Sequence, residues 1–393
     1  MTEKASSSNN PGHSLPRVAV VAFPWQSNAP YRFLSDVVRI LTPIAEKVIL
    51  ITGNTDRIEL EPDRTEIRDI GVSVHYVREM RPLSYSAILW IVRCFLAQIL
   101  MTREMVKVRD SFQIVIFYMA YPYYLLPLIV AKILGKRTIE VVTRGRRNSL
   151  ISRIIQFQDP ILYALLDGIS PESNSLLREL NLSRYRHKIL PEGARYIDFS
   201  HYAVKVPINM RRNVVGYIGR FDRHKGIVEF IQSIPLIAQD ICDVEFLIVG
   251  SGKLSPWVLD ECKKIEFDWN IKSIHVLDWV PSSQIPEILN TLKLLVLPSM
   301  GEGLPTIILE SMACGTPVLT TPRGAVPELI IDGETGFIME TNSPDCIKVN
   351  VTRVLRFPAI DGITTNALKF AKTHFSFQNA KNRYQQMLRN SDG

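Results

Sequence analysis

The sequence lacks the cysteine patterns that stabilise small secreted proteins or bind zinc. None of its cysteines forms a Cys-x-x-Cys pair, and their number is odd: they are Cys94, Cys242, Cys262, Cys314 and Cys346. This scatter argues against a disulfide framework or a structural zinc site and favours a reducing compartment. The apolar stretch of a secretory signal is also missing from residues 1–16, MTEKASSSNNPGHSLP, which we interpret as a disordered leader.

Long apolar runs are missing too, and a helix that spans a bilayer needs about 20 such residues. Tyr85–Met101 is mostly apolar but has Arg93 at its centre, and Tyr121–Leu134 is shorter and contains two prolines. We expect neither segment to span a membrane. They are either ordinary buried helices or an interfacial apolar surface on a basic domain.

Nucleic-acid-binding motifs are absent as well, because no array of Lys and Arg interleaved with aromatic residues occurs. We therefore predict no nucleic-acid partner. The net charge of +7 is nevertheless uneven: residues through Pro207 contain 27 Lys and Arg against 19 Asp and Glu, and the remainder contains 19 against 20. The basic half is either a solvated surface or a face for an anionic partner, such as a peripheral membrane surface.

What the sequence does contain is a regular alternation of short apolar runs and helix-length amphipathic segments. This alternation predicts βαβ units and a parallel sheet. The 393 residues are too many for one compact domain and suit two. In the first half we expect helices such as Tyr31–Leu41 and Pro171–Leu180, and strands at Arg17–Phe23, Lys47–Thr52, Val72–Val77, Phe112–Tyr118, Thr138–Val142 and Lys188–Leu190.

The pattern restarts after Lys205–Asn213, a polar stretch with one proline that we interpret as a linker. We therefore predict an α/β protein with two doubly wound, Rossmann-like domains, residues 17–207 and 208–375, and a C-terminal helix at 376–393. Ligands of such sheets bind outside the carboxyl ends of the strands, and a cleft between the two domains is the expected place. The second-half strands are expected at Val214–Ile218, Val244–Val249, Ile274–Leu277, Leu294–Leu297 and Pro317–Thr320.

Two loops in the second half have features of a diphosphate-binding site. In VVGYIGRFDRHKGIVEFI a strand ends near Gly219, and Arg220 and Lys225 flank the loop before the next helix. Two cations at the carboxyl edge of a strand suit a diphosphate, since Arg can contact two oxygens at once. In VEFLIVGSGKL, Gly250 and Gly252 would let the backbone approach a ligand closely. A solvated loop and a plain tight turn are the ordinary alternatives.

A third loop lies in SMGEGLPTIILESMACGTPVL, between an apolar strand and a helix. Pro305 suits the first turn of that helix. The N–H groups of Gly303 and Leu304 would then point outward at the helix N-terminus, where the helix dipole favours an anion.

Two glutamates frame this third loop, Glu302 before the helix and Glu310 in its second turn. Carboxylates beside a phosphate site are poorly placed to bind phosphate, but they are well placed to accept hydrogen bonds from sugar hydroxyls. Two glutamates eight positions apart occur by chance in most chains. The glycines and prolines around them make the pattern specific.

Together, the stretches GRFDRHKG, VGSG, PSMGEGLPTIILESMACGTPV, GAVPELI and DGETGF resemble the retaining glycosyltransferases of the large family four, which have the GT-B fold. The resemblance is specific from about Val214 to the C-terminus and only topological before it. It implies that Arg220 and Lys225 bind the donor diphosphate and that Glu302 holds hydroxyls of the donor sugar.

The resemblance assigns the rest of the donor site as well. It implies that the backbone at Gly303 and Leu304 binds the distal phosphate and that Glu310 holds the ribose. The loop that ends at Val280 would lie beside the nucleobase. The C-terminal helix would pack back on the N-terminal domain. The remaining donor-binding positions would be Gly219, Gly250, Gly252 and Pro305.

The resemblance further implies a retaining hexosyltransferase that takes a UDP- or GDP-sugar and a lipid-linked or polysaccharide acceptor, with no cofactor and no metal. No Asp-x-Asp pair occurs in the sequence, which fits a metal-independent site. We expect the protein in the cytoplasm or peripherally on the inner face of the cell membrane. A nucleotide-sugar epimerase or hydrolase on the same fold, or a non-catalytic relative, is the alternative.

The N-terminal half departs from the usual pattern of this family in three loops. PWQSNAPYR, after the first strand, has no glycine, YMAYPYY has no histidine, and a later strand ends in VTRGRR where relatives often have His-Gly. Arg144, Arg146 and Arg147 in that last stretch are candidates for binding an anionic acceptor.

Overall fold

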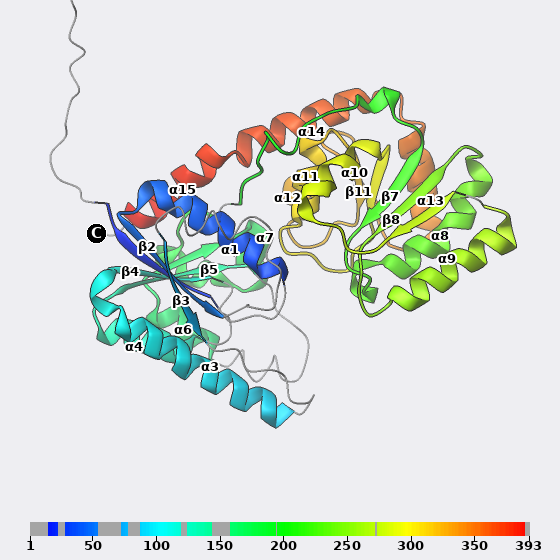
Figure 1. Cartoon of the computed structure of the whole chain (residues 1–393). Coiled ribbons are helices and arrows are strands. Elements are labelled where there is room, and N and C mark those ends of the chain that lie inside the picture. Colours follow the sequence, from blue (N-terminus) through cyan, green and yellow to red (C-terminus); the bar gives the residue numbers. More distant parts are fainter. Residues whose placement is uncertain are drawn as a thin grey trace, which may run out of the picture. The chain divides into compact units, whose positions relative to one another are not determined.

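The computed structural model describes residues 15–22, 28–53, 72–77, 87–118, 124–143, 158–193, 195–271 and 273–389 (Figure 1). The chain forms two compact units. The first comprises Met1–Val141, Ile155–Ile169 and Gln385–Gly393, and the second comprises Val142–Ile154 and Ser170–Tyr384.

The first sheet has the strand order β3-β2-β1-β4-β5-β6, with parallel pairing from β3 through β5. Its central strands are β1, RVAVV, which is apolar after Arg17, and β4, IVIFY, which is apolar throughout, because both faces of a central parallel strand are covered. The strands are β1 (Arg17–Val21), β2 (Lys47–Gly53), β3 (Ser73–Val77), β4 (Ile114–Tyr118), β5 (Arg137–Val142) and β6 (Gly168–Pro171).

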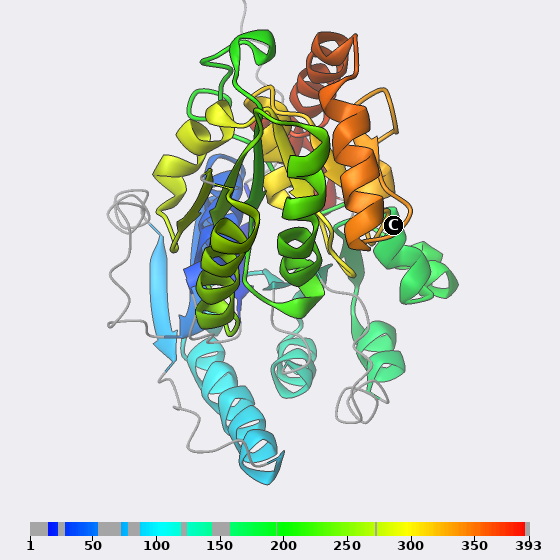
Figure 2. The same cartoon turned by 90° about the vertical axis from the view of Figure 1, so that its right-hand side faces the viewer.

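The second sheet has the equivalent order, β12-β11-β10-β7-β8-β9, and all its adjacent strands are parallel. Along its strands, successive side chains point to opposite faces of the sheet, and each face is covered by a separate hydrophobic core. Tyr217 and Ile248 pack with helices α8, α9 and α13, a face seen in Figure 2. Ile218 and Val249 pack with α10, α11 and α14. The strands are β7 (Val214–Ile218), β8 (Glu245–Val249), β9 (Ile274–Leu277), β10 (Leu294–Leu297), β11 (Val318–Thr320) and β12 (Phe337–Ile338).

The predicted fold class, two doubly wound α/β domains, is confirmed by these two sheets and their helices. The described helices are α1 (Asn28–Leu41), α3 (Ala87–Lys107), α4 (Leu125–Ile133), α6 (Asp159–Leu165), α7 (Asn174–Glu179), α8 (Ile227–Asp240), α9 (Ser255–Trp269), α10 (Ile285–Thr291), α11 (Thr306–Ala313), α12 (Val326–Leu329), α13 (Pro344–Leu355), α14 (Ile360–His374) and α15 (Phe377–Arg389). None of these described helices is both long enough and apolar enough to cross a membrane.

The edge strand of the first sheet was predicted at the wrong place. Lys188–Leu190 is not a strand, because Lys188 ends a 3₁₀-helix, η3 (Leu182–Lys188). The sixth strand is β6, whose sequence GISP is short and carries little β signal. The helix expected from Pro171 begins later, at Asn174, after Ser173 accepts the backbone N–H of Leu176 as an N-cap.

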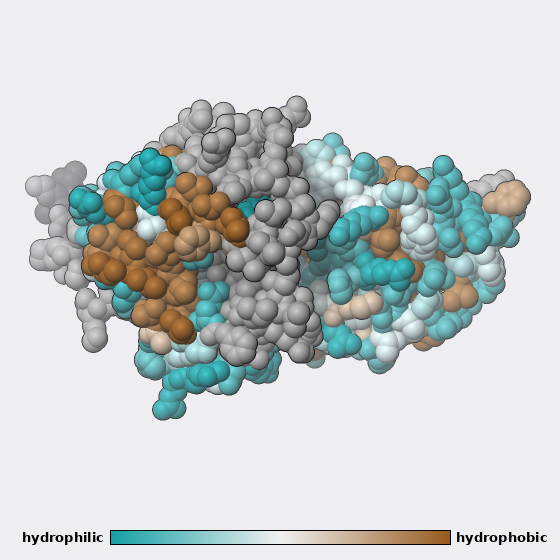
Figure 3. Space-filling model, turned by 90° about the horizontal axis from the view of Figure 1, so that it is seen from below, coloured by the Kyte–Doolittle hydropathy of each residue, from teal (hydrophilic) through white to brown (hydrophobic). Residues whose placement is uncertain are grey.

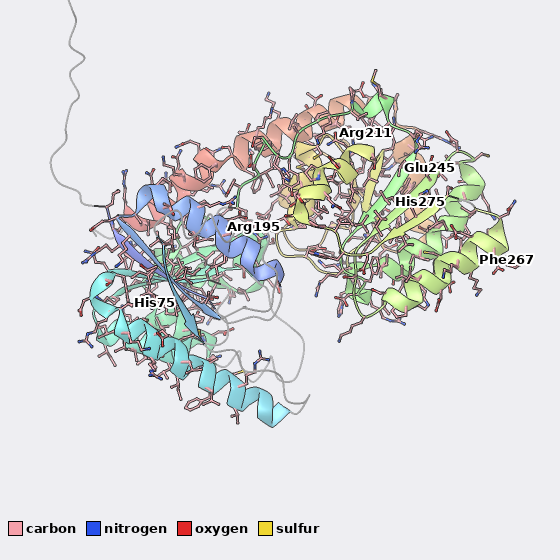
Figure 4. The ribbon with its side chains drawn as sticks, in the orientation of Figure 1. His75, Arg195, Arg211, Glu245, Phe267 and His275 are labelled. Carbon is pink, nitrogen blue, oxygen red and sulfur yellow. The ribbon has the colours of Figure 1, made fainter. Side chains whose placement is uncertain are left out.

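The stretch Lys205–Asn213, expected to be a linker, is anchored to the second unit by Arg211. This side chain is buried, and Figure 4 labels it. Its guanidinium donates to the carbonyl oxygens of Val206 (2.9 Å), Leu289 (3.1 Å), Leu292 (2.9 Å) and Cys314 (2.7 Å). A polar sequence signals exposure on average, and here the tertiary contacts override that signal.

The last helix, α15, contributes its final residues to the first unit. The guanidinium of Arg137, at the start of β5, donates to the carbonyl oxygens of Leu388 (2.8 Å) and Met387 (3.1 Å). A cation at these C-terminal carbonyls satisfies acceptors that have no partner within a helix and complements the helix dipole.

Candidate active site

The candidate site lies where the strand order of the second sheet reverses. β7 pairs with β8 on one side and with β10 on the other, so the chain leaves β7 and β10 at the same sheet edge. Ligands of open α/β sheets bind at such a switch point. Two loops start here, Gly219–Gly226 after β7 and Pro298–Pro305 after β10. They contain about half of the predicted site residues, among them Arg220, Lys225 and Glu302.

An ion pair joins the two loops. The Lys225 Nζ lies 2.7 Å from the Glu302 Oε2, and the side chains are 25% and 11% exposed. The backbone N–H of Met300 donates to the His224 carbonyl oxygen (2.9 Å), which ties the loops together beside the pair. The sequence predicted both charged residues in the site but gave no sign that they contact each other.

Arg220 extends outward from the first loop. Its side chain is 68% exposed, and its Nη1 lies 3.2 Å from the Asp222 Oδ2. The hydroxyl of buried Tyr217 donates to the Arg220 carbonyl oxygen (2.9 Å). Burial, and then the negative charges of Glu302 and Asp222, raise the pKa of Tyr217, so the hydroxyl keeps its proton and its donor role. Tyr217 thus holds the backbone from which Arg220 projects.

Gly250 and Gly252 allow the loop after β8 to pack against the loop after β7. A Cβ on Gly250, whose φ is +147°, would lie 1.9 Å from the Gly219 carbonyl oxygen. A Cβ on Gly252 would lie 2.6 Å from the Phe221 carbonyl oxygen. The glycines are therefore needed for loop packing, and their contact with a ligand stays a prediction.

Two further glycines, which were not predicted as site residues, hold the ion pair in place. Gly226, next to Lys225, has φ +71°, and a Cβ there would lie 2.1 Å from the Pro298 carbonyl oxygen. Gly324 has φ +57°, and a Cβ there would lie 1.8 Å from the Glu302 carbonyl oxygen. The sequence signal for Gly324 was the motif GAVPELI, which lies far from Glu302 in the chain.

The helix after Glu302 begins one residue later than predicted. Pro305 takes the N-cap position, α11 starts at Thr306, and Gly315 follows its C-cap with φ +66°. Leu304 is buried and Gly303 is half-buried. The predicted phosphate contact of these two backbone positions is compatible with the loop and stays a prediction.

Glu310, predicted to hold a ribose, lies inside the unit with only 2% of its surface exposed. Burial, and then the nearby Glu310 carboxylate, raise the pKa of the Cys314 thiol to about 12. The ribose contact of Glu310 stays a prediction.

The other predicted site residues are more distant or outside the described residues. Val280 is half-buried and follows β9. In the second sheet β8 lies between β9 and β7, so this loop is farther from the Lys225–Glu302 pair along the sheet edge. The acceptor candidates Arg144, Arg146 and Arg147 lie outside the described residues. Among the residues that the structure describes, no three His, Cys, Asp or Glu side chains are grouped so that they could hold a metal ion.

Residues 212–356 match the sequence model of a protein family described as glycosyl transferases group 1. An uncharacterized glycosyltransferase from Methanocaldococcus jannaschii is 31% identical over 142 residues, which cover 35% of this chain and 37% of that protein. The capsular polysaccharide biosynthesis glycosyltransferase CapM from Staphylococcus aureus is 28% identical over 188 residues, which cover 46% of this chain and 48% of CapM. The chain thus spans less than half the length of these two relatives.

Solved structures share the fold over nearly the whole chain. Anabaena Alr3699/HepE, solved in complex with UDP and glucose, has a TM-score of 0.72 at 15% identity and covers 95% of this chain and 100% of its own. At this identity the likeness is one of fold, and it agrees with the two doubly wound sheets. The matched domain at residues 212–356, which contains the Lys225–Glu302 site, is thus similar to the glycosyl transferases group 1 family.

Proposed function

We propose that this protein is a retaining glycosyltransferase that moves a hexose from a nucleoside diphosphate sugar to an acceptor. The Lys225–Glu302 ion pair at the switch point of the second sheet carries the proposal. The pair brings a cation and a carboxylate to one place, which supports binding of a phosphate by Lys225 and of sugar hydroxyls by Glu302. Alr3699/HepE, of like fold, was solved with UDP and with UDP-glucose, which supports a UDP-sugar as donor; a GDP-sugar is the alternative.

Charge stabilisation by the site explains how the glycosidic bond breaks. As the bond from the sugar C1 to the donor phosphate oxygen breaks, negative charge builds on the leaving nucleoside diphosphate. Lys225 and Arg220 stabilise that charge, together with the N-terminus of α11. The proposed donor site therefore uses neither a metal nor a cofactor.

The new bond forms on the face that the leaving group vacates. The acceptor oxygen attacks C1 from that face, and the acceptor proton passes to the leaving phosphate oxygen. Glu302 then acts as a positioning residue that accepts hydrogen bonds from sugar hydroxyls. The Lys225 ammonium at 2.7 Å lowers the nucleophilicity of its carboxylate. A covalent glycosyl adduct isolated on Glu302 would contradict this role.

The acceptor that we propose is lipid-linked or a polysaccharide, reached at the inner face of the cell membrane. The net charge of +8 through Pro207 supports an anionic surface near this half of the chain. CapM, a relative in the matched region, is by name an enzyme of capsular polysaccharide biosynthesis. Arg144, Arg146 and Arg147 are the proposed acceptor contacts.

Nucleotide binding tests the donor site first. A ligand at 100 times its Kd stabilises a protein by about 2.7 kcal/mol, so UDP-, GDP- and other nucleotide sugars can be ranked by thermal shift. We expect Lys225→Ala to lose most of that shift. Lys348→Ala is the matched control, since Lys348 makes a 2.7 Å ion pair with Asp240 and is 30% exposed. An unchanged shift in Lys225→Ala would count against the proposed donor site.

Product analysis then separates the reaction classes. Incubation with the stabilising donor and a membrane extract should yield a new glycoside of unchanged anomeric configuration. Free sugar as the only product would indicate a hydrolase, and an altered nucleotide sugar would indicate an epimerase. Nucleotide binding without any product would favour a non-catalytic relative.

A further inference from the structure

An apolar face covers neighbouring helices of the first unit. In Figure 3 it is the large hydrophobic area on that unit. Its exposed side chains come from α3, α4 and α6, and adjacent pairs of these helices contact each other. We call this the apolar face; its residues and their exposed fractions are Val92 (45%), Phe95 (59%), Ile99 (39%), Ile129 (39%), Ile133 (78%) and Ile161 (53%).

Packing among the described residues of the unit does not account for the apolar face. The core side of α3 is formed by Cys94, Ala97, Met101 and Met105, which are buried at helical spacing. A surface helix with such a core stripe normally turns polar residues to solvent. In α3 the opposite side is apolar as well, through Phe95 and its neighbours. Contiguous exposed apolar surface of this kind marks an interaction site.

Charges around the apolar face favour an anionic partner. The described parts of α3, α4 and α6 contain only two acidic residues. Asp159 is buried, and Glu104 is paired with Lys107 at 2.7 Å. Arg103 is exposed near the C-terminal end of α3, beyond the apolar side chains. The face thus combines an apolar centre with a cation at one end.

We propose that the apolar face docks on an anionic lipid bilayer. This inference deepens the proposed function, because it names the surface that would bring the enzyme to a membrane-borne acceptor. A shallow bilayer contact suits the face, since the aliphatic and Phe side chains can enter the interface while Arg103 meets lipid phosphates. A second copy of the chain is a less suitable occupant, because the half of the chain through Pro207 carries a net +8 and two such halves repel.

Vesicle co-sedimentation of the full chain tests the proposal. We expect binding to vesicles of 70% phosphatidylcholine and 30% phosphatidylglycerol at 50 mM NaCl. Binding should weaken at least about tenfold when NaCl is raised to 500 mM or when the anionic lipid is left out, because surface charge is screened or absent. Equal binding to purely zwitterionic vesicles would overturn the proposed role of charge.

A double substitution tests whether the side chains of the apolar face are needed for vesicle binding. The double variant Phe95→Ser, Ile133→Ser should lower vesicle binding at least about tenfold, and both side chains are exposed enough to be replaced without loss of the fold. Phe267→Ser is the matched control, since Phe267 on α9 of the second unit is 87% exposed and lies outside the face (Figure 4). It should bind vesicles as the parent does. Unimpaired binding by the double variant would overturn the proposal.

Two further measurements keep this proposal separate from the proposed function. Light scattering without lipid reports self-association, and a dimer that the double variant loses would assign the face to a second copy and overturn bilayer docking. The nucleotide thermal shift of the double variant should equal that of the parent. Vesicle binding without transfer activity would refute the proposed function alone, whereas transfer activity without vesicle binding would refute the docking proposal alone.

Discussion

Glu140, a buried carboxyl in the first sheet, allows a stability prediction with a definite pH dependence. It lies on β5, opposite Phe117 of β4, and is 3% exposed. Burial raises the pKa of Glu140 to about 7, the Tyr124 hydroxyl acts in the opposite direction, and the charge of Asp159 raises it further. The substitution Glu140→Gln removes the titrating group and nearly preserves its shape.

The magnitude of this pH dependence follows from the difference between the pKa of Glu140 in the folded chain and in the unfolded chain. The unfolded chain releases this proton near the ordinary pKa of 4.5, whereas the folded chain holds it up to about 7. Between these values the folded state binds more protons, so the free energy of unfolding falls as pH rises. A difference of about 2.5 pKa units corresponds to about 3 kcal/mol, lost in full above pH 7 and not at all below pH 4.5.

Urea denaturation of the parent and the Glu140→Gln variant at pH 5 and pH 8 measures this effect. We expect similar free energies of unfolding at pH 5 and a variant more stable by up to about 3 kcal/mol at pH 8. Glu172→Gln is the control, because the Glu172 Oε2 lies 2.9 Å from the Arg195 Nη2 and its removal should destabilise at both pH values. A Glu140→Gln difference that does not change between pH 5 and pH 8 would refute the reasoning.

Three other substitutions test the second unit. Gly324→Ala should abolish the nucleotide thermal shift, because its Cβ would displace the Glu302 carbonyl, whereas Gly333→Ala, with a similar φ of +75° and nothing within 4 Å, should keep it. Equal effects of the two would show that backbone strain alone is responsible. Arg211→Met should lower the urea-measured free energy of unfolding by at least about 3 kcal/mol, since several buried carbonyl oxygens lose their donors. A loss below about 1 kcal/mol would mean that these acceptors find other partners. Glu328→Gln should cost about 1 kcal/mol in the same assay, because its carboxylate accepts the backbone N–H groups of Asn174 (2.9 Å) and Ser175 (2.6 Å) at the N-terminus of α7. An unchanged urea midpoint would show that α7 does not depend on this cap.

Local apolar patterning was enough to predict most strands. β7, β9 and β10 have the predicted bounds, because each is a short apolar run between polar turns. β6 was missed, since GISP contains one large apolar residue and becomes a strand only through pairing at the sheet edge. Lys188–Leu190, which contains the apolar pair Ile189 and Leu190, was predicted as a strand, and the structure ends a 3₁₀-helix there.

The candidate site was predicted in part. Lys225 and Glu302 were identified from residue type and loop context, and the structure brings them together. Gly324 and Tyr217 were missed as supports of the site. Their importance depends on backbone contacts with residues distant in the chain, such as the carbonyl of Glu302, and such contacts leave no mark in local composition.

The sequence by itself determined the repeated strand-helix pattern, the glycine-bearing loops and the two spaced glutamates, because each depends on neighbouring residues. Only the tertiary structure decided which loops meet. Lys225 and Glu302 are 77 positions apart and join because the order of the second sheet puts β7 beside β10. The outward apolar side of α3 was likewise decided by tertiary packing, since a helix with two apolar sides does not reveal which one the core covers.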